Sequence, residues 1–263
     1  MRMRRLGWAG IELEADDDRL VIDPLVDPGI FSAFLGPEAE PRVAPEPGVA
    51  RAALLTHLHR DHADVGALDA AVTPGGEVLR PEAASATEFD EFVTGEAERG
   101  LAETGRPQVL ARAGDARRIG AFEVTALPAV DGLGSPQVSW LVEAGGRRVL
   151  HGGDTLWHGG WWAIAAAAGP IHVACLPANG VEIDYPNLQP AADGVPAVMT
   201  PEQSVQAARA LRADVLVPMH DVRMFEHETY YRPVTGARQR LTEAGAAAGV
   251  AVRITAPGDW IEV

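Results

Sequence analysis

Hydrophobic and polar positions alternate in several short stretches of the chain, a pattern typical of half-buried β-strands. Near the N-terminus, Ile11 and Leu13 alternate with Glu12 and Glu14, and an apolar run at 20–22 follows an acidic turn. The pattern predicts a β-hairpin that opens the chain. It also predicts strands at 52–55, 122–126, 138–143, 148–150, 171–176, 215–217, 251–254 and 260–263.

Longer segments have helical composition, and we expect helices at 83–103, 155–168, 200–214 and 237–248. One of these has a clear start signal. Thr200 suits the N-cap, Pro201 suits the first helical position, and Gln203 completes a capping box.

Two segments rich in proline and glycine, 23–48 and 181–198, are predicted to be long irregular loops. Loops of this length often carry function. We find no linker, tandem repeat or low-complexity tract in the sequence. The elements therefore predict one α/β domain spanning residues 1–263, with mixed sheets and flanking helices.

The charge of the chain excludes several classes of chemistry. All 22 basic residues are arginine, and 37 acidic residues leave a net charge of −15. Without lysine there can be no Schiff base and no phosphate-binding loop of the GxxxxGK type. Nucleic acids and anionic membranes bind through dense positive charge, so we expect neither as a partner.

The sequence is expected to remain in the cytoplasm. Acidic residues follow the basic N-terminus too soon for a signal peptide, and no apolar run approaches the roughly 20 residues of a membrane span. The single cysteine, Cys175, excludes an internal disulfide and lies in a predicted buried strand. We interpret it as a core residue. The oligomeric state is open, a homo-oligomer included.

The richest segment for chemistry is 56–64, where His57, His59, Asp61 and His62 follow a predicted buried strand. In a loop at a strand end, the alternate residues His57 and His59 can converge on one ion while Asp61 and His62 turn toward a second. Imidazole and carboxylate are ligands that zinc, iron and manganese accept. A cluster of surface histidines is the alternative, and the density of the motif favours metal.

An HxHxDH motif after a hydrophobic strand resembles the metallo-β-lactamase superfamily of metal-dependent hydrolases. The resemblance covers nearly the whole chain. The segments 7–13, 21–24, 151–155, 176–180 and 217–221 are similar to the L-ascorbate-6-phosphate lactonase-like branch. The resemblance implies an αββα sandwich, with two mixed β-sheets flanked by helices, and a site for two divalent ions.

The resemblance also implies a role for each ligand. His57 and His59 would hold the first metal, Asp61 and His62 the second, Asp154 would bridge both, and His220 would complete the second site. The expected catalytic residues are Asp61, which would handle the proton, and the bridging Asp154.

The chain departs from the family pattern at Asp131, which stands where relatives carry a histidine ligand of the first metal. Asp131 could replace that ligand, or it could be too short and leave the first site weak or empty. Alternatively, His151 or His158 supplies the nitrogen. We expect zinc as the metal, but a carboxylate here would make the charge of the ligands and ions neutral and would move the preference toward manganese or iron, which are the alternatives. It would also attract an anionic substrate less.

Four further residues are candidates around the metals. Asp23 could accept a hydrogen bond from a ligand histidine and so orient it, although an ordinary turn is an equal alternative. Asn179, Trp157 and Tyr185 are candidate substrate-binding residues, because they lie in segments that follow strands or the bridging aspartate. Core or interface packing is the competing explanation for Trp157.

These features predict a lactonase-like metal-dependent hydrolase in which a metal-bound hydroxide attacks a lactone, ester or amide. The expected substrate is a small molecule, neutral or weakly charged. Three alternatives stay open: a phosphodiesterase on the same fold, a di-iron or di-manganese enzyme that uses oxygen, and a degenerate metal-binding protein.

Overall fold

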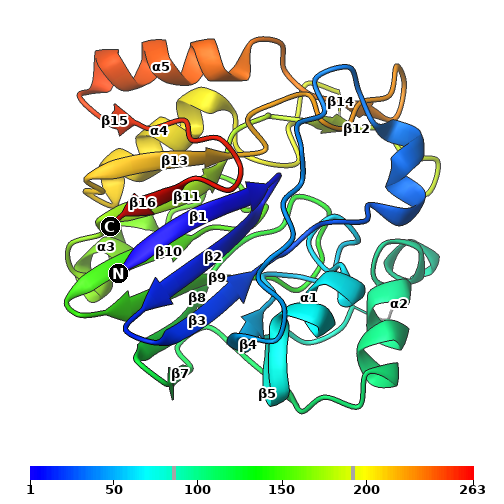
Figure 1. The fold of residues 1–263 in the computed structure, drawn as a ribbon. Coiled ribbons are helices and arrows are strands. Elements are labelled where there is room, and N and C mark those ends of the chain that lie inside the picture. Colours follow the sequence, from blue (N-terminus) through cyan, green and yellow to red (C-terminus); the bar gives the residue numbers. More distant parts are fainter. Residues whose placement is uncertain (85–86, 191–192) are drawn as a thin grey trace.

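The computed structural model describes residues 1–84, 87–190 and 193–263. Its described residues form two seven-stranded sheets with helices on both outer sides (Figure 1). Each sheet contains antiparallel and parallel strand pairs. The expected αββα sandwich with two mixed sheets is therefore confirmed.

The first sheet has an antiparallel half near the chain ends and a parallel half that leads to the histidine motif. In spatial order its strands are β16 (Trp260–Glu262), β1 (Arg2–Gly7), β2 (Gly10–Ala15), β3 (Asp18–Ile22), β4 (Ala50–Leu54), β5 (Val72–Arg80) and β6 (Gln108–Leu110). The helices α1 (Val65–Ala71) and α2 (Glu88–Glu103) cover its outer face, where Leu68 and Leu101 pack with Val21.

The second sheet is antiparallel at one end and parallel at the other. In spatial order its strands are β15 (Ala251–Val252), β13 (Val215–Met219), β11 (Val173–Pro177), β10 (Arg147–His151), β9 (Val138–Ala144), β8 (Phe122–Pro128) and β7 (Ala116–Ile119). The outer helices are α3 (Trp161–Ala168), α4 (Pro201–Ala210) and α5 (Ala237–Ala248), and a separate pair joins β12 (Glu182–Ile183) to β14 (Tyr231–Arg232).

The main core lies between the sheets. Ile11 and Leu13 of the first sheet share one buried cluster with Phe122 and Trp140 of the second. Trp140 also donates a hydrogen bond from Nε1 to the backbone oxygen of Leu55, at 3.0 Å. This bond ties the second sheet to the residue that opens the histidine-rich loop.

Several predicted elements need correction. The helix predicted at 155–168 begins only at Trp161, because Thr155 forms a β-bridge with Asp131 and two glycines follow at 159 and 160. Strand β5 and helix α1 were not predicted, and strand β1 precedes the predicted hairpin. The loop predicted at 23–48 contains a short 3-10 helix, η1 (Gly29–Phe34).

Other predictions differ less from the structure. The capping box at Thr200 is present, but helix α4 ends at Ala210, before the predicted 214. Helix α2 begins at Glu88, after a capping box at Thr87; part of the predicted start, residues 85 and 86, lies outside the described residues. None of the helices in the described ranges combines the length and apolarity needed to cross a membrane.

Candidate metal centre

Strand ends bring the predicted ligands together. The histidine-rich loop follows β4, Asp154 follows β10 and His220 follows β13. Strands β10, β11 and β13 run parallel, so the loops after them emerge at the same edge of the second sheet. The fold thus places residues far apart in the sequence at one site between the two sheets.

The first group consists of His57, His59 and Asp131, whose ligand atoms all lie within 4.8 Å of one another. His59 Nδ1 lies 4.0 Å from Asp131 Oδ1. The other carboxylate oxygen of Asp131 accepts hydrogen bonds from the backbone N–H groups of Leu133 and Ser135, both at 2.9 Å. Asp131 is therefore held with Oδ1 toward His59, and the structure brings it into the group.

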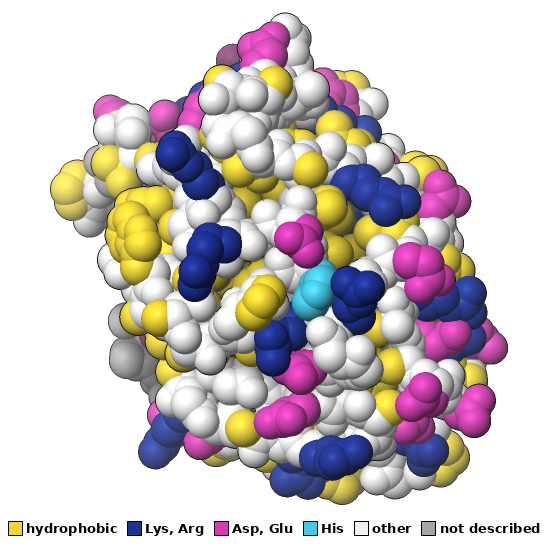
Figure 2. All heavy atoms as spheres, turned by 90° about the vertical axis from the view of Figure 1, so that its left-hand side faces the viewer, with side chains coloured by type: hydrophobic (Ala, Val, Ile, Leu, Met, Phe, Trp, Pro, Cys, Tyr) yellow, Lys and Arg dark blue, Asp and Glu magenta, His cyan; other side chains and the backbone are white. Residues whose placement is uncertain are grey.

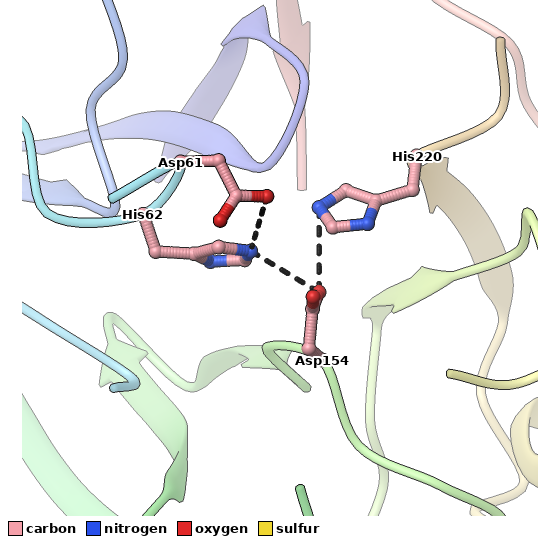
Figure 3. A group of neighbouring side chains, drawn as sticks. All are labelled: Asp61, His62, Asp154 and His220. Carbon is pink, nitrogen blue, oxygen red and sulfur yellow. Dashed lines mark ion pairs between the residues drawn. The ribbon is translucent and has the colours of Figure 1, made fainter. Parts of the chain in front are cut away.

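The second group consists of Asp61, His62, Asp154 and His220 (Figure 3). One oxygen of Asp154, Oδ1, lies 3.1 Å from His62 Nε2 and 3.3 Å from His220 Nε2. Asp61 Oδ2 lies 3.8 Å from the same nitrogen of His62. Four ligand atoms from three separate loops thus face one another.

The buried polar atoms of these groups test whether the residues fit metal ions. In the described part of the chain, His57 Nε2, His62 Nε2, Asp154 Oδ1 and both ring nitrogens of His220 have no hydrogen-bond partner. Leaving such atoms buried and unpaired costs about 1–3 kcal/mol each. Because all of them are nitrogen or carboxylate donors, two divalent ions fit this arrangement.

The pKa shifts of the ligand residues also agree with bound cations. Burial lowers the pKa of His62, but the carboxylates of Asp154 and Asp61 outweigh burial and raise that pKa well above its usual range. Burial raises the pKa of Asp154 to about 6. Burial and neighbouring histidines lower the pKa values of His57 and His220. The carboxylates of Asp154 and Asp61 thus favour a positive charge beside them, as a bound cation would supply.

Asp23, the predicted orienting aspartate, lies fully buried behind the ligands. Its Oδ2 accepts a hydrogen bond from His62 Nδ1 at 2.8 Å and another from Thr56 Oγ1 at 2.6 Å. Because Nδ1 of His62 donates to Asp23, Nε2 is left to face Asp61 and Asp154. The sequence left an ordinary turn as an equal alternative, and the structure shows the histidine contact.

Two histidines that were alternatives for the first metal lie outside both ligand groups. His151 Nε2 lies 2.8 Å from the backbone oxygen of Ala9. His158 stacks on Trp161 and accepts a hydrogen bond at Nδ1 from the backbone of Gly160. Neither ring lies among the ligand atoms, whereas Asp131 does, so the geometry favours Asp131 in the first group.

A cavity of about 30 Å³ adjoins the ligands. Four ligand residues contribute to its wall: His59, Asp61, Asp131 and Asp154. The rest of the wall is apolar or phenolic and is formed by Phe31, Val93, Leu133, Val181, Ile183, Tyr185, Ala197, Val198, Phe225 and Tyr231. The predicted substrate-binding residue Tyr185 lies in this wall.

The other two predicted substrate-binding residues lie elsewhere. Trp157 lines a separate, open hollow with Trp162 and Arg209 and is absent from the wall of the cavity. Trp157 packs instead against the hydrophobic cluster that includes residues of helices α3, α4 and α5, and its substrate contact stays a prediction. Asn179 is buried behind the cavity and contacts Tyr231.

The sequence did not single out three residues that the structure places at the site. Trp8 donates to Asp61, Ser135 lies 2.8 Å from His59 Nε2, and Tyr231 lines the cavity. Trp8 lies in a glycine-flanked turn that was noted only as part of a resemblance. Ser135 and Tyr231 carry no signal in the sequence: Ser135 lies in the loop after Asp131, and Tyr231 lies in the two-residue strand β14.

Comparison with known proteins adds the family. A profile of the beta-lactamase superfamily domain matches residues 18–220, a range that contains every proposed ligand. The chain belongs to the beta-lactamase superfamily. This match confirms the superfamily that the HxHxDH motif indicated.

Individual relatives span the length of the chain. A UPF0173 metal-dependent hydrolase of Symbiobacterium thermophilum is 26% identical over 266 residues, covering 98% of both chains. Among solved structures, isothiocyanate hydrolase from Delia radicum gut bacteria has a TM-score of 0.67 and 16% identity, with 100% of this chain and 99% of that one covered. CmlA, a diiron β-hydroxylase from Streptomyces venezuelae, has a TM-score of 0.73 and 17% identity; all of this chain matches 54% of that one.

The structural matches show a shared fold, and the family match and ligand groups give the coarse class. This superfamily member is a metal-dependent hydrolase with two groups of side chains that could bind ions.

Proposed function

We propose that this protein hydrolyses a lactone, ester or amide bond in a small uncharged molecule, with two divalent metal ions as cofactors. The observation that carries the proposal is the pair of ligand groups at the wall of a cavity that is otherwise apolar. The resemblance to the lactonase-like branch supports the choice of bond.

The first ion would be held by His57, His59 and Asp131. The second would be held by Asp61, His62, Asp154 and His220, with Asp154 also reaching toward the first. When bound, the ions supply a water made acidic enough to attack at neutral pH and a positive charge that polarises the carbonyl group.

The chain's own residues orient the ligands and handle the proton. Asp61 lies at the cavity wall, where its carboxylate is fixed by the N–H group of Trp8 at 2.8 Å. From there it can accept a proton from water and return it to the leaving group. The apolar wall excludes bulk water from the reacting atoms.

Zinc is the proposed metal, and Asp131 makes manganese or iron alternatives. A site with an added carboxylate in place of histidine favours harder ions. Element analysis of protein purified without added metal tests this choice.

The proposal is tested by removing ligands one at a time. Asp154→Ala should lose both metal and esterase or lactonase turnover, because one Asp154 oxygen faces two histidines of the second group. His59→Ala should lose the first ion. His227→Ala is the matched control, because His227 stacks on Tyr230 outside both ligand groups. A metal-free Asp154→Ala protein with full turnover would sink the proposal.

A second candidate is an oxygen-dependent enzyme with two iron or manganese ions. Its support is the carboxylate in the first ligand group, together with the fold shared with the diiron β-hydroxylase CmlA. Protein that is coloured as purified, contains about two iron ions per chain and consumes oxygen with a substrate would favour this candidate. Colourless zinc protein that cleaves esters anaerobically would favour hydrolysis.

The proposal also covers the partners of the enzyme, its location in the cell and its oligomeric state. The net charge of −15 and the absence of lysine support a small-molecule substrate rather than nucleic acid or an anionic membrane. On the face shown in Figure 2, arginine and acidic side chains are interspersed rather than gathered by sign. The single cysteine is buried beside Met3, which supports the proposed cytoplasmic location. A homo-oligomer is compatible with this proposal.

A further inference from the structure

The cavity beside the ligands is built from segments distant in the sequence. Phe31 comes from η1, Val93 from α2, Ile183 from β12 and Phe225 from the loop after β13. Val93, Tyr185 and Phe89 form a small hydrophobic cluster separate from the main core. Val93 and Tyr185 also line the cavity, so this apolar cluster forms part of its wall.

The cavity wall contains no cationic group within the described ranges 1–84, 87–190 and 193–263. Its charged residues are acids and a histidine of the ligand groups. A carboxylate or phosphate on the distal part of a substrate would be buried here without a partner. Such burial costs several kcal/mol, which is enough to exclude the charged form.

Tyr231 is the polar group of the wall whose hydrogen-bonding direction can be deduced. Asn179 Oδ1 accepts a hydrogen bond from the backbone N–H of Val181, at 3.2 Å, which fixes the orientation of the amide. The opposite end, Nδ2, therefore donates to Tyr231 Oη, at 3.5 Å.

Because the Tyr231 oxygen accepts from Asn179, its own hydrogen is left to donate elsewhere. Among the described residues, no acceptor for this hydrogen is found. Tyr231 itself lines the cavity with Asp61 and Asp154. The phenol is thus a donor without an acceptor at the cavity wall.

We propose that this cavity selects substrates with an uncharged hydrocarbon side chain, and that Tyr231 donates a hydrogen bond to the carbonyl oxygen of the scissile bond. The inference rests on the proposed hydrolysis and makes it specific. As the carbonyl carbon is attacked, its oxygen gains negative charge, so a fixed donor stabilises the transition state more than the substrate.

The substrate class is tested with two esters of equal length. Metal-loaded protein should hydrolyse p-nitrophenyl hexanoate with a kcat/KM at least about a hundredfold above that for mono-p-nitrophenyl adipate, whose remote carboxylate has no partner in the cavity. Equal values, or a preference for the adipate ester, would overturn the proposed selectivity.

The role of the phenol is tested with Tyr231→Phe, which keeps the ring and removes the donor. We expect kcat for the hexanoate ester to fall roughly tenfold to a hundredfold, with KM changed less than about threefold. Tyr230→Phe is the control, because Tyr230 stacks on His227 and is absent from the cavity wall. A wild-type kcat in a folded, metal-loaded Tyr231→Phe protein would overturn the role of Tyr231.

A binding measurement separates this inference from the proposed hydrolysis. Calorimetry of the metal-loaded protein should show hexanamide binding at least about tenfold tighter than adipamate, and Tyr231→Phe should weaken hexanamide binding. If no ester is cleaved but these binding differences hold, the proposed hydrolysis fails and the recognition stands. If esters are cleaved without regard to the remote charge or Tyr231, the hydrolysis stands and the inference fails.

Discussion

Trp8 stacks on the proposed metal ligand His220, with ring centroids 3.8 Å apart and an interplanar angle of 16°. The same indole donates a hydrogen bond from Nε1 to Asp61 Oδ2, at 2.8 Å. Both stacked residues have left-handed backbones, with φ of +49° at Trp8 and +52° at His220. One side chain from the turn between β1 and β2 thus fixes two ligands of the second group.

The contacts of Trp8 predict an effect on metal affinity. In Trp8→Phe the stacking ring is kept and the donor to Asp61 is lost, so we expect the second ion to bind about tenfold more weakly. Competition with a chelator of known affinity measures this change. Trp162→Phe is the control, since Trp162 is 59% exposed and lies in the open hollow. Unchanged affinity in Trp8→Phe would show that the hydrogen bond does not position Asp61.

Removing metal should lower thermal stability. The ligand groups leave five buried nitrogen or oxygen atoms unpaired in the described residues, and an ion that binds only the folded state stabilises it. At a free metal concentration of 100 times Kd the gain is about 2.7 kcal/mol, or roughly 5–10 °C in Tm for a chain of this size. Calorimetry with and without chelator measures the shift. Asp154→Ala should show less than half of it; an equal shift in that variant would place the stabilising ion elsewhere.

Much of the fold can be predicted from the alternation of hydrophobic and polar residues, but some strands do not show this pattern. Strand β1 carries arginines whose side chains pair with acids of β2: Arg2 with Glu14 and Arg4 with Glu12, both at 2.8 Å. Strand β5 contains Pro74 and two glycines, which are typical of a turn. These strands depend on pairing with neighbours that the local sequence does not reveal.

In the site, too, residues close together in the sequence can be predicted, whereas contacts between distant segments cannot. His57, His59, Asp61 and His62 are readable because they occur within one loop. The contact of Trp8 with Asp61 spans 53 residues and the contact of Asn179 with Tyr231 spans 52. Such pairs arise from the packing of the two sheets and β12–β14, so no motif in a single segment marks them.

Asp131 offers a sharp test of the first ligand group. In Asp131→Asn, the amide oxygen should take the hydrogen bonds from the backbone of Leu133 and Ser135, which now go to Oδ2. The NH₂ group would then face His59, where it repels a cation. We expect about one ion per chain instead of two, measured by element analysis. Asp259→Asn, at an exposed position, should keep both ions. Two ions in Asp131→Asn would mean that Asp131 is not a ligand.

Gly153 holds the loop that presents Asp154, and it has no room for a side chain. A Cβ atom there would lie 2.7 Å from Cβ of Thr56, and the backbone φ is +62°. Gly146 is the comparison position: its φ is +75°, and an added Cβ would have nothing within 4 Å. A substitution there therefore measures the cost of the backbone strain without a steric clash. Gly146→Ala should cost about 1–2 kcal/mol, and Gly153→Ala should cost more, because Thr56 is held by Asp23 and cannot retreat.

The displaced loop in Gly153→Ala should also move Asp154 away from His62 and His220. We therefore expect Gly153→Ala to lose metal affinity, while Gly146→Ala keeps it despite a similar backbone strain. Denaturant unfolding of the chelated proteins gives the free energies, and chelator competition gives the affinities. Equal destabilisation of the two variants, with metal binding intact in both, would show that the contact between Gly153 and Thr56 does not set the position of Asp154.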